Sequence, residues 1–282
     1  MRIFYNTNGF AHHRLRDALA VLEAAGYDGV SLTLDVLHAD LEDPGLHLDF
    51  AVELLRDSPL AIAIETGGRY VLDPLRKHRP NLLDEGAPGD LRLDFYKRAV
   101  DFAVQVDSPL VSLWSGALPD GEDLNHARER LVERTTRLLQ HARSSGVRIA
   151  MEPEPGMLVE TLGDFDQLVA GDCMSDLALT CDLGHLYCSE SPPYPDLLLS
   201  RADRLVNVHV DDIAGGRHEH LELGAGDIDF LPLLSALDEV GYDGPLSVEL
   251  SRSSHRAVEA AQNSIVFLKN VLSAIPSPSS PR

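Results

Sequence analysis

The chain has 282 residues, of which 44% are hydrophobic; this is enough for one large domain or two modest ones, and it excludes a disordered or fibrous protein. Its 24 Lys and Arg against 45 Asp and Glu give a net charge of −21, which disfavours general binding to nucleic acid or to anionic membrane surfaces. The sequence contains no apolar run of the roughly 20 residues that span a bilayer and no signal-peptide pattern at its start, so we expect a cytoplasmic protein without nucleic-acid or membrane partners.

Short β-rich runs recur along the chain, and a stretch with helical periodicity follows each of them. Most runs are continuously apolar, as in 110–114 and 205–210, which is typical of parallel strands buried on both faces. Eight units of about 35 residues approach the size of the common eightfold barrel. We therefore predict the α/β class and a single (β/α)8 TIM barrel over residues 1–272, with a flexible tail at 273–282. The predicted strands are 2–5, 29–34, 61–65, 110–114, 147–152, 177–182, 206–210 and 246–250.

Three of the intervening helices have clear ends, because a glycine that suits a left-handed C-cap follows each of them. These predicted helices are 11–25 before Gly26, 121–145 before Gly146 and 230–240 before Gly241. The segment Gly224-Ala-Gly226 predicts a turn rather than a phosphate-binding loop, because it does not follow a strand in a βαβ unit.

Four residues with metal-ligand chemistry end four successive predicted strands. They are Glu152, Asp182, His209 and Glu249, and the carboxyl ends of barrel strands are where reactive groups gather. Any one of these acids alone is better explained as a helix cap or a solvated charge. Three carboxylates that converge would repel one another unless a cation neutralised them, so we predict one divalent metal ion. Oxygen ligands with one imidazole favour Mn²⁺ or Mg²⁺, with Zn²⁺, Co²⁺ or Fe²⁺ as alternatives. The other polar or aromatic strand ends are Asn6, Asn8, Glu65 and Trp114.

Five segments around these positions form a recognisable set: AMEPEPG at 150–156, TCDLGH at 180–185, NVHVDD at 207–212, HLELGAGDIDF at 220–230 and LSVEL at 246–250. With them the chain resembles the xylose-isomerase-like TIM barrel superfamily over almost its whole length, to about residue 272. That group includes sugar-phosphate isomerase/epimerase proteins, ketose 3-epimerases, hydroxypyruvate isomerases, inosose dehydratases and endonuclease IV. The Asp-x-x-His pair and the run that begins at His220 are fairly specific in this order.

The resemblance implies roles for single residues. In the epimerase-like branch, the residues that match Glu152, Asp182, His209 and Glu249 hold one divalent metal ion. The residue that matches His185 faces the substrate in that branch and is a metal ligand in endonuclease IV. His220 matches an endonuclease IV ligand by its spacing to the Gly-x-Gly run, and His218 stands where that family has an aspartate; both could equally be plain loop residues.

Two departures restrict what the resemblance implies. Ketose 3-epimerases place a substrate-binding arginine six residues beyond the metal histidine, where this chain has Gly215, and the nearest arginine is Arg217. Endonuclease IV brings further histidines from its third and fourth strands, which here end in Glu65 and Trp114. We therefore do not expect a three-metal site.

The loop 67–90 carries a local positive segment, with Arg69 and the run Arg76-Lys-His-Arg79. The simpler interpretation is a solvated face. The alternative is a lid that closes over a substrate carboxylate or phosphate, since arginine binds such groups in a bidentate manner and the glycines and prolines of the loop permit movement. Trp114 either forms an apolar wall for a sugar ring or caps the core.

These features predict a divalent-metal-dependent isomerase or epimerase that acts on a small sugar or hydroxy-ketone through a metal-stabilised enediolate. Glu152 and Glu249 would approach the substrate from different sides as the acid/base pair. The same enediolate could expel a β-hydroxyl, so a dehydratase or lyase acting on a keto-sugar or inosose is the alternative. An endonuclease IV-like phosphodiesterase or a catalytically silent pathway protein fits less well. The partner is a polyol or ketose, with an anionic substrate and a homodimer left open. The predicted substrate-binding residues are Asn6, Trp114, Glu154, His185, Arg217, His218 and His220.

Overall fold

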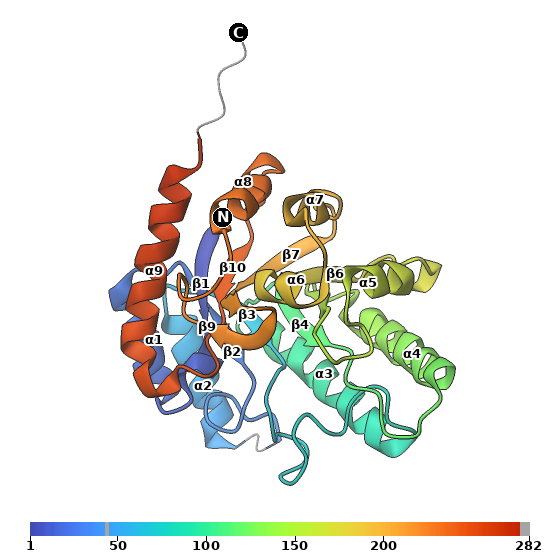
Figure 1. The fold of residues 1–282 in the computed structure, drawn as a ribbon. Coiled ribbons are helices and arrows are strands. Elements are labelled where there is room, and N and C mark those ends of the chain that lie inside the picture. Colours follow the sequence, from blue (N-terminus) through green and yellow to red (C-terminus); the bar gives the residue numbers. More distant parts are fainter. Residues whose placement is uncertain (43–44, 277–282) are drawn as a thin grey trace.

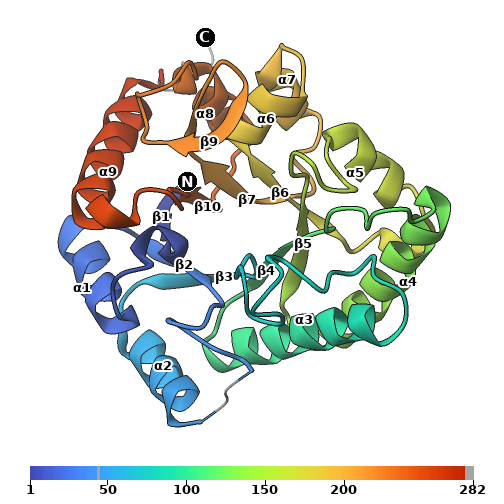
Figure 2. The ribbon, with the colours of Figure 1, turned by 60° about the horizontal axis from the view of Figure 1, so that its bottom comes forward.

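A computed structural model of the protein describes residues 1–42 and 45–276. Within these residues eight parallel strands close into a barrel in the order β1, β10, β7, β6, β5, β4, β3 and β2, so the predicted TIM barrel is confirmed (Figures 1 and 2). Every predicted strand is present, with ends that agree to within two residues. The barrel strands are β1 (Arg2–Asn6), β2 (Gly29–Thr33), β3 (Ala61–Glu65), β4 (Leu110–Trp114), β5 (Arg148–Glu152), β6 (Ala178–Asp182), β7 (Leu205–Val210) and β10 (Pro245–Val248).

Helices surround the barrel on its outside, as Figure 2 shows. They are α1 (Leu15–Ala25), α2 (Leu46–Asp57), α3 (Ala87–Gln105), α4 (Leu124–Ala142), α5 (Leu162–Val169), α6 (Leu183–Ser189), α7 (Tyr194–Leu199), α8 (Phe230–Glu239) and α9 (Ala257–Ala274). None of the helices in the described residues is both long enough and apolar enough to cross a membrane. The tail predicted at 273–282 lies mostly outside the described residues, and α9 continues to Ala274.

Three predicted helix boundaries differ from the structure by three residues or more. The helix expected over 11–25 begins only at Leu15. The helix expected over 121–145 begins only at Leu124, because the side chain of Asp123 accepts hydrogen bonds from the first free N–H groups and caps the helix. It ends at Ala142, where the hydroxyl of Ser145 bonds the Ala142 carbonyl before the chain reaches Gly146. The left-handed C-cap predicted at Gly26 is confirmed.

The amino-terminal end of the barrel interior is closed by side chains. Phe4 packs there with Ala63, Leu110 and small residues of β5 and β6, and Gly29 is required because a Cβ atom would collide with the Phe4 ring. Hydroxyl pairs between non-adjacent strands cross the interior above this layer: Ser31 with Ser247 at 2.7 Å, and Ser112 with Thr180 at 2.8 Å. These layers leave the carboxyl end of the barrel as the place for a site.

A short antiparallel hairpin, not predicted from the sequence, follows β7. It consists of β8 (Asp212–Ala214) and β9 (Arg217–Leu221) and packs beside α6. The carboxylate of Asp212 holds its base by accepting backbone hydrogen bonds from Gly224, Gly226 and Ile228. The Gly224-Ala-Gly226 segment is therefore a turn, as predicted, and its N–H groups are already used.

Candidate active site

The four predicted metal-binding residues meet at the carboxyl end of the barrel. Glu152 ends β5, Asp182 ends β6, His209 lies near the end of β7 and Glu249 follows β10 directly. One potential ligand atom of each lies within 4.8 Å of those of the others. Nδ1 of His209 is 3.0 Å from Glu152 Oε1 and also 3.0 Å from Glu249 Oε2. The convergence expected from the strand ends is thus present in the fold.

The far side of the His209 ring is held by a residue of β3. Glu65 is 5% exposed, and its Oε1 lies 2.9 Å from Nε2 of His209 and accepts a second hydrogen bond from Asn207 at 2.9 Å. With a metal ion at Nδ1, a carboxylate at Nε2 would hold the proton on that nitrogen and leave the Nδ1 lone pair for the ion. Glu65 was only a strand-end candidate in the sequence; the structure makes it the residue that orients His209.

The charges of this cluster are strongly coupled. Burial by itself lowers the pKa of His209, but Glu152, Glu65 and Glu249 outweigh burial and raise that pKa well above its usual value. Burial raises the pKa of Glu152 above its usual value. For Glu249 burial acts in the same direction, yet the attraction of His209 prevails and its pKa lies below the usual range.

The donor set fits a divalent cation. One oxygen of Asp182 accepts the N–H of His185 and caps α6, whereas its Oδ2 is buried and has no hydrogen-bond partner among the described residues. A buried carboxylate oxygen without a donor is costly unless something positive lies beside it. Together with Glu152, His209 and Glu249, this oxygen offers the mixed carboxylate and imidazole ligands that such ions prefer.

Two asparagines of the first strand region support the same end of the barrel. Nδ2 of Asn8 donates to Glu249 Oε1 at 2.7 Å and so orients that carboxylate. Asn6 also lines the cavity, but its Oδ1 accepts hydrogen bonds from the Asn8 N–H and the Thr33 hydroxyl. Its side-chain oxygen therefore serves the local structure, and only its amide nitrogen remains for a substrate.

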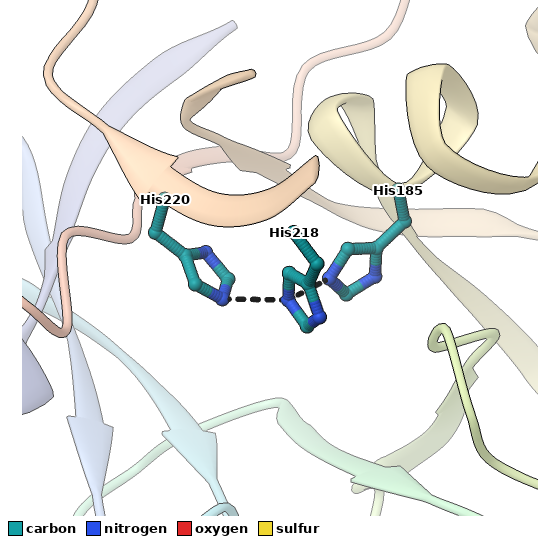
Figure 3. Close-up of side chains that lie close together, drawn as sticks. All are labelled: His185, His218 and His220. Atoms are coloured by element: carbon teal, nitrogen blue, oxygen red, sulfur yellow. Dashed lines mark hydrogen bonds between the residues drawn. The ribbon is translucent and has the colours of Figure 1, made fainter. Parts of the chain in front are cut away.

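A second histidine group lies next to the four residues. Figure 3 shows His185 approaching from α6 and His218 and His220 from β9, with the three rings facing one another. Nε2 of His218 is 3.1 Å from Nε2 of His185 and 2.8 Å from Nε2 of His220. Nδ1 of His185 donates to the Pro153 carbonyl at 3.1 Å, so its other nitrogen points inward. The spacing of His218 and His220 places both on one face of β9.

The protonation of these rings differs because their neighbours differ. Burial lowers the pKa of His218 to about 4, and the adjacent His185 and His220 act in the same direction. His220 is buried too, but contact with the Asp211 carboxylate raises its pKa to about 10. Further groups with metal-ligand spacing in the described residues are the three histidines and the set Asp182, Asp211 and His220.

The three histidines line a cavity together with Glu152, His209 and Glu249. Its volume is about 520 Å³, within the size range of small-molecule sites. Glu154 lies in its wall, where burial and then the Glu152 charge raise the Glu154 pKa to about 7. Trp114 is only 4% exposed, and the ring of His78 packs against it with centroids 5.0 Å apart. His78 therefore covers most of Trp114 on the side of the cavity.

The structure does not bring every predicted substrate-binding residue into this cavity. Asn6, Trp114, Glu154, His185, His218 and His220 line it, whereas Arg217 does not. The side chain of Arg217 is 71% exposed and lies beside Glu219, because residues alternate along β9 and this one faces away from the histidines.

Sequence reasoning did not single out several polar residues of the cavity, among them Asp35, His78 and Arg252. His78 was visible only as part of a charged run. Arg252 follows the last strand, and its guanidinium donates to the His218 carbonyl at 3.1 Å. Its place after a strand end was the one available signal.

The profile of the xylose isomerase-like TIM barrel family matches residues 19–271. The chain belongs to this family. The match confirms the resemblance seen in the sequence motifs over most of the barrel.

This xylose isomerase-like protein has several curated relatives. It is 27% identical to uncharacterized protein MJ1311 of Methanocaldococcus jannaschii over 165 residues, 56% of each chain. It is 30% identical to an inosose dehydratase of Lacticaseibacillus casei over 146 residues, 46% of this chain and 49% of the relative. The chain thus spans about half the length of these two. With L-ribulose-5-phosphate 3-epimerase UlaE of Escherichia coli O1:K1 / APEC it shares 24% identity over 257 residues, 83% of this chain and 81% of the relative.

Solved structures show the same fold at lower identity. A D-tagatose 3-epimerase-like protein superposes with a TM-score of 0.80 at 19% identity, covering 98% of both chains. The IolI protein with a bound zinc atom superposes with a TM-score of 0.78 at 21% identity, covering 99% of this chain and 100% of that one.

Proposed function

We propose that this protein is a divalent-metal-dependent isomerase or epimerase of a small sugar or hydroxy-ketone. The observation that carries the proposal is the placement of Glu152 and Glu249, which reach the same nitrogen of His209 from non-neighbouring strands of the barrel. Two carboxylates on different sides of one substrate carbon are what removal and return of a proton require. Sugar epimerases among the relatives support this reaction class.

The two carboxyl groups differ in pKa, which suits them to different steps of the reaction. The pKa of Glu249 lies below its usual range and that of Glu152 above it, so of the two carboxyl groups Glu152 holds a proton more readily. Neighbouring groups whose pKa values are pushed apart can serve as base and acid. Glu249 would take the proton from the carbon next to the substrate carbonyl, and Glu152 would deliver one to the enediolate.

The other cavity residues orient the substrate. A divalent ion held by Glu152, Asp182, His209 and Glu249 would supply the positive charge that offsets negative charge developing on substrate oxygens. His185, whose inward Nε2 lies 3.1 Å from Nε2 of His218, would share with that ring the contact to a substrate oxygen, and Glu154, with a pKa of about 7, can accept a hydrogen bond from a hydroxyl or donate one to it.

A dehydratase is the second candidate. The same first step, removal of a proton beside a carbonyl, leads to elimination when a β-hydroxyl leaves instead of a proton returning. The 30% identity to an inosose dehydratase favours this reading, although it covers less than half of this chain. A product that is lighter than the substrate by one water molecule, measured by mass spectrometry, would establish the dehydratase and exclude the epimerase.

Solvent exchange tests the proposal. The protein is incubated with its bound metal and a panel of ketoses in D₂O, and deuterium incorporation next to the carbonyl is followed by NMR. We expect incorporation by the wild type and loss of it in Glu152→Gln and in Glu249→Gln. Glu160→Gln, an exposed carboxyl in the same loop region, is the control and should retain exchange. Full exchange in both cavity variants would refute the two-carboxylate scheme.

A further inference from the structure

Three cations line the cavity although the chain as a whole has a large excess of acids. Arg69 and Lys77 belong to the loop between β3 and α3, and Arg252 follows β10 on another part of the barrel mouth. Among the described residues, none of the three forms an ion pair with a carboxylate. With 45 acidic residues against 24 basic ones, partners are abundant, so unpaired cations at a cavity call for an explanation.

Neighbouring cations outside the cavity behave differently. Arg76, in the same loop, pairs with Asp73 at 2.6 Å, and Arg79 pairs with Asp84 at 3.0 Å. Arg256, four residues beyond Arg252, pairs with Glu222 at 3.2 Å. The positive run seen in the sequence thus contains two kinds of residue. Arg76 and Arg79 pair with carboxylates within their loop, whereas Lys77 has no carboxylate partner among the described residues.

The unpaired cations create a positive region around His78. Burial, and after it the charges of Lys77, Arg92 and Arg69 in that order, lower the pKa of His78 to about 3. These three positive side chains therefore lie close enough to His78 to act on it. Arg92 is buried behind Trp114, with its guanidinium carbon 5.4 Å from the centre of that ring.

The floor of the cavity has the opposite sign. Glu152 and Glu249 lie there, Asp182 belongs to the same cluster, and Glu65 and Glu154 are also in the wall of the cavity. A negatively charged group on a substrate would be repelled from the floor and attracted to the cations of the rim. The charge of the cavity wall therefore changes sign with depth: it is negative at the floor, where we propose proton transfer, and positive at the rim.

We propose that Arg69, Lys77 and Arg252 form an anion subsite, and that the substrate is a hydroxy-ketone or ketose with a phosphate or carboxylate group away from the reacting carbon. Arginine and lysine bind both anions through charge-assisted hydrogen bonds. The proposal rests on the proposed function for the reaction at the floor, but the subsite itself requires only the three cations and the cavity.

Binding of inorganic phosphate tests the subsite without any catalysis. Isothermal titration of the full-length protein should show saturable phosphate binding that weakens about tenfold in Arg69→Ala, Lys77→Ala or Arg252→Ala, because each removes a charge-assisted hydrogen bond. Arg76→Ala and Arg256→Ala are matched controls from the same loops and should bind phosphate as the wild type does. No binding by the wild type, or equal weakening in the controls, would overturn the proposal.

Kinetics with three substrate groups identifies the anion. The KM for phosphorylated ketoses should rise about tenfold in the cavity variants while the KM for neutral ketoses stays unchanged, if the anion is phosphate. The same split for sugar acids alone identifies a carboxylate. An equal rise for neutral ketoses overturns the subsite. Phosphate binding without deuterium exchange into any ketose would leave the subsite standing and reject the proposed function.

Discussion

Replacement of Glu65 by glutamine tests the role of the carboxylate that contacts His209. The change keeps the size of the side chain and removes its charge. In the structure Glu65 Oε1 lies 2.9 Å from both His209 Nε2 and Asn207 Nδ2, and the side chain is buried. A glutamine oxygen at this place would still accept from Asn207 and from the His209 N–H, but without the charge of the carboxylate, so the proton on Nε2 would be held less firmly.

The size of the effect follows from the charge that is lost. A hydrogen bond to a charged group contributes about 1–1.5 kcal/mol more than a neutral one, which corresponds to roughly a tenfold loss of metal affinity at Nδ1. Competition with a chromophoric chelator measures this affinity. Glu154→Gln is the matched control, because Glu154 lies in the same cavity and makes no hydrogen bond to His209 among the described residues.

The outcome separates orientation from simple loss of charge. Glu65→Gln should weaken metal binding and also broaden or split the NMR signals of the His209 ring, whereas Glu154→Gln should do neither. An unchanged affinity in Glu65→Gln, or an equal loss in both variants, would show that Glu65 does not act through His209.

Three further changes have defined expected results. Asp182→Asn should lower metal content, measured by elemental analysis, and melting temperature together, since an ion present at 100 times its Kd stabilises the folded state by about 2.7 kcal/mol; unchanged metal content would remove Asp182 from the ligand set. Asn8→Ala frees Glu249 Oε1 and should reduce the rate of solvent exchange with little change in metal content, whereas an unaffected rate would show that Glu249 needs no such support. For His78, the pKa of about 3 in the folded protein lies below the usual histidine pKa of 6.5, so between these pH values the unfolded chain binds the extra proton and stability falls as the pH falls. His78→Phe should therefore flatten the pH dependence of the unfolding free energy in this window, and an identical slope in urea titrations would contradict the burial of a neutral ring.

Much of the site could be predicted because it follows from strand ends. Glu152, Asp182 and His209 end consecutive parallel strands, and parallel strands of one barrel bring their ends to the same rim whatever the loops do. Arg217 was predicted to bind the substrate, but its side chain lies outside the cavity. The prediction went astray because the β8–β9 hairpin was not predicted. Without that strand, the alternation that turns His218 and His220 inward and Arg217 outward could not be seen.

The sequence by itself determined the barrel, its strand positions and the four residues that converge at its mouth, since apolar runs and their spacing are local properties of the chain. Only the tertiary structure decided that Glu65 lies behind His209, that Asp182 has one oxygen without a partner, and that Arg69, Lys77 and Arg252 remain unpaired while Arg76 does not. Those features depend on contacts between residues far apart in sequence and on loop conformations, which hydrophobic periodicity does not encode.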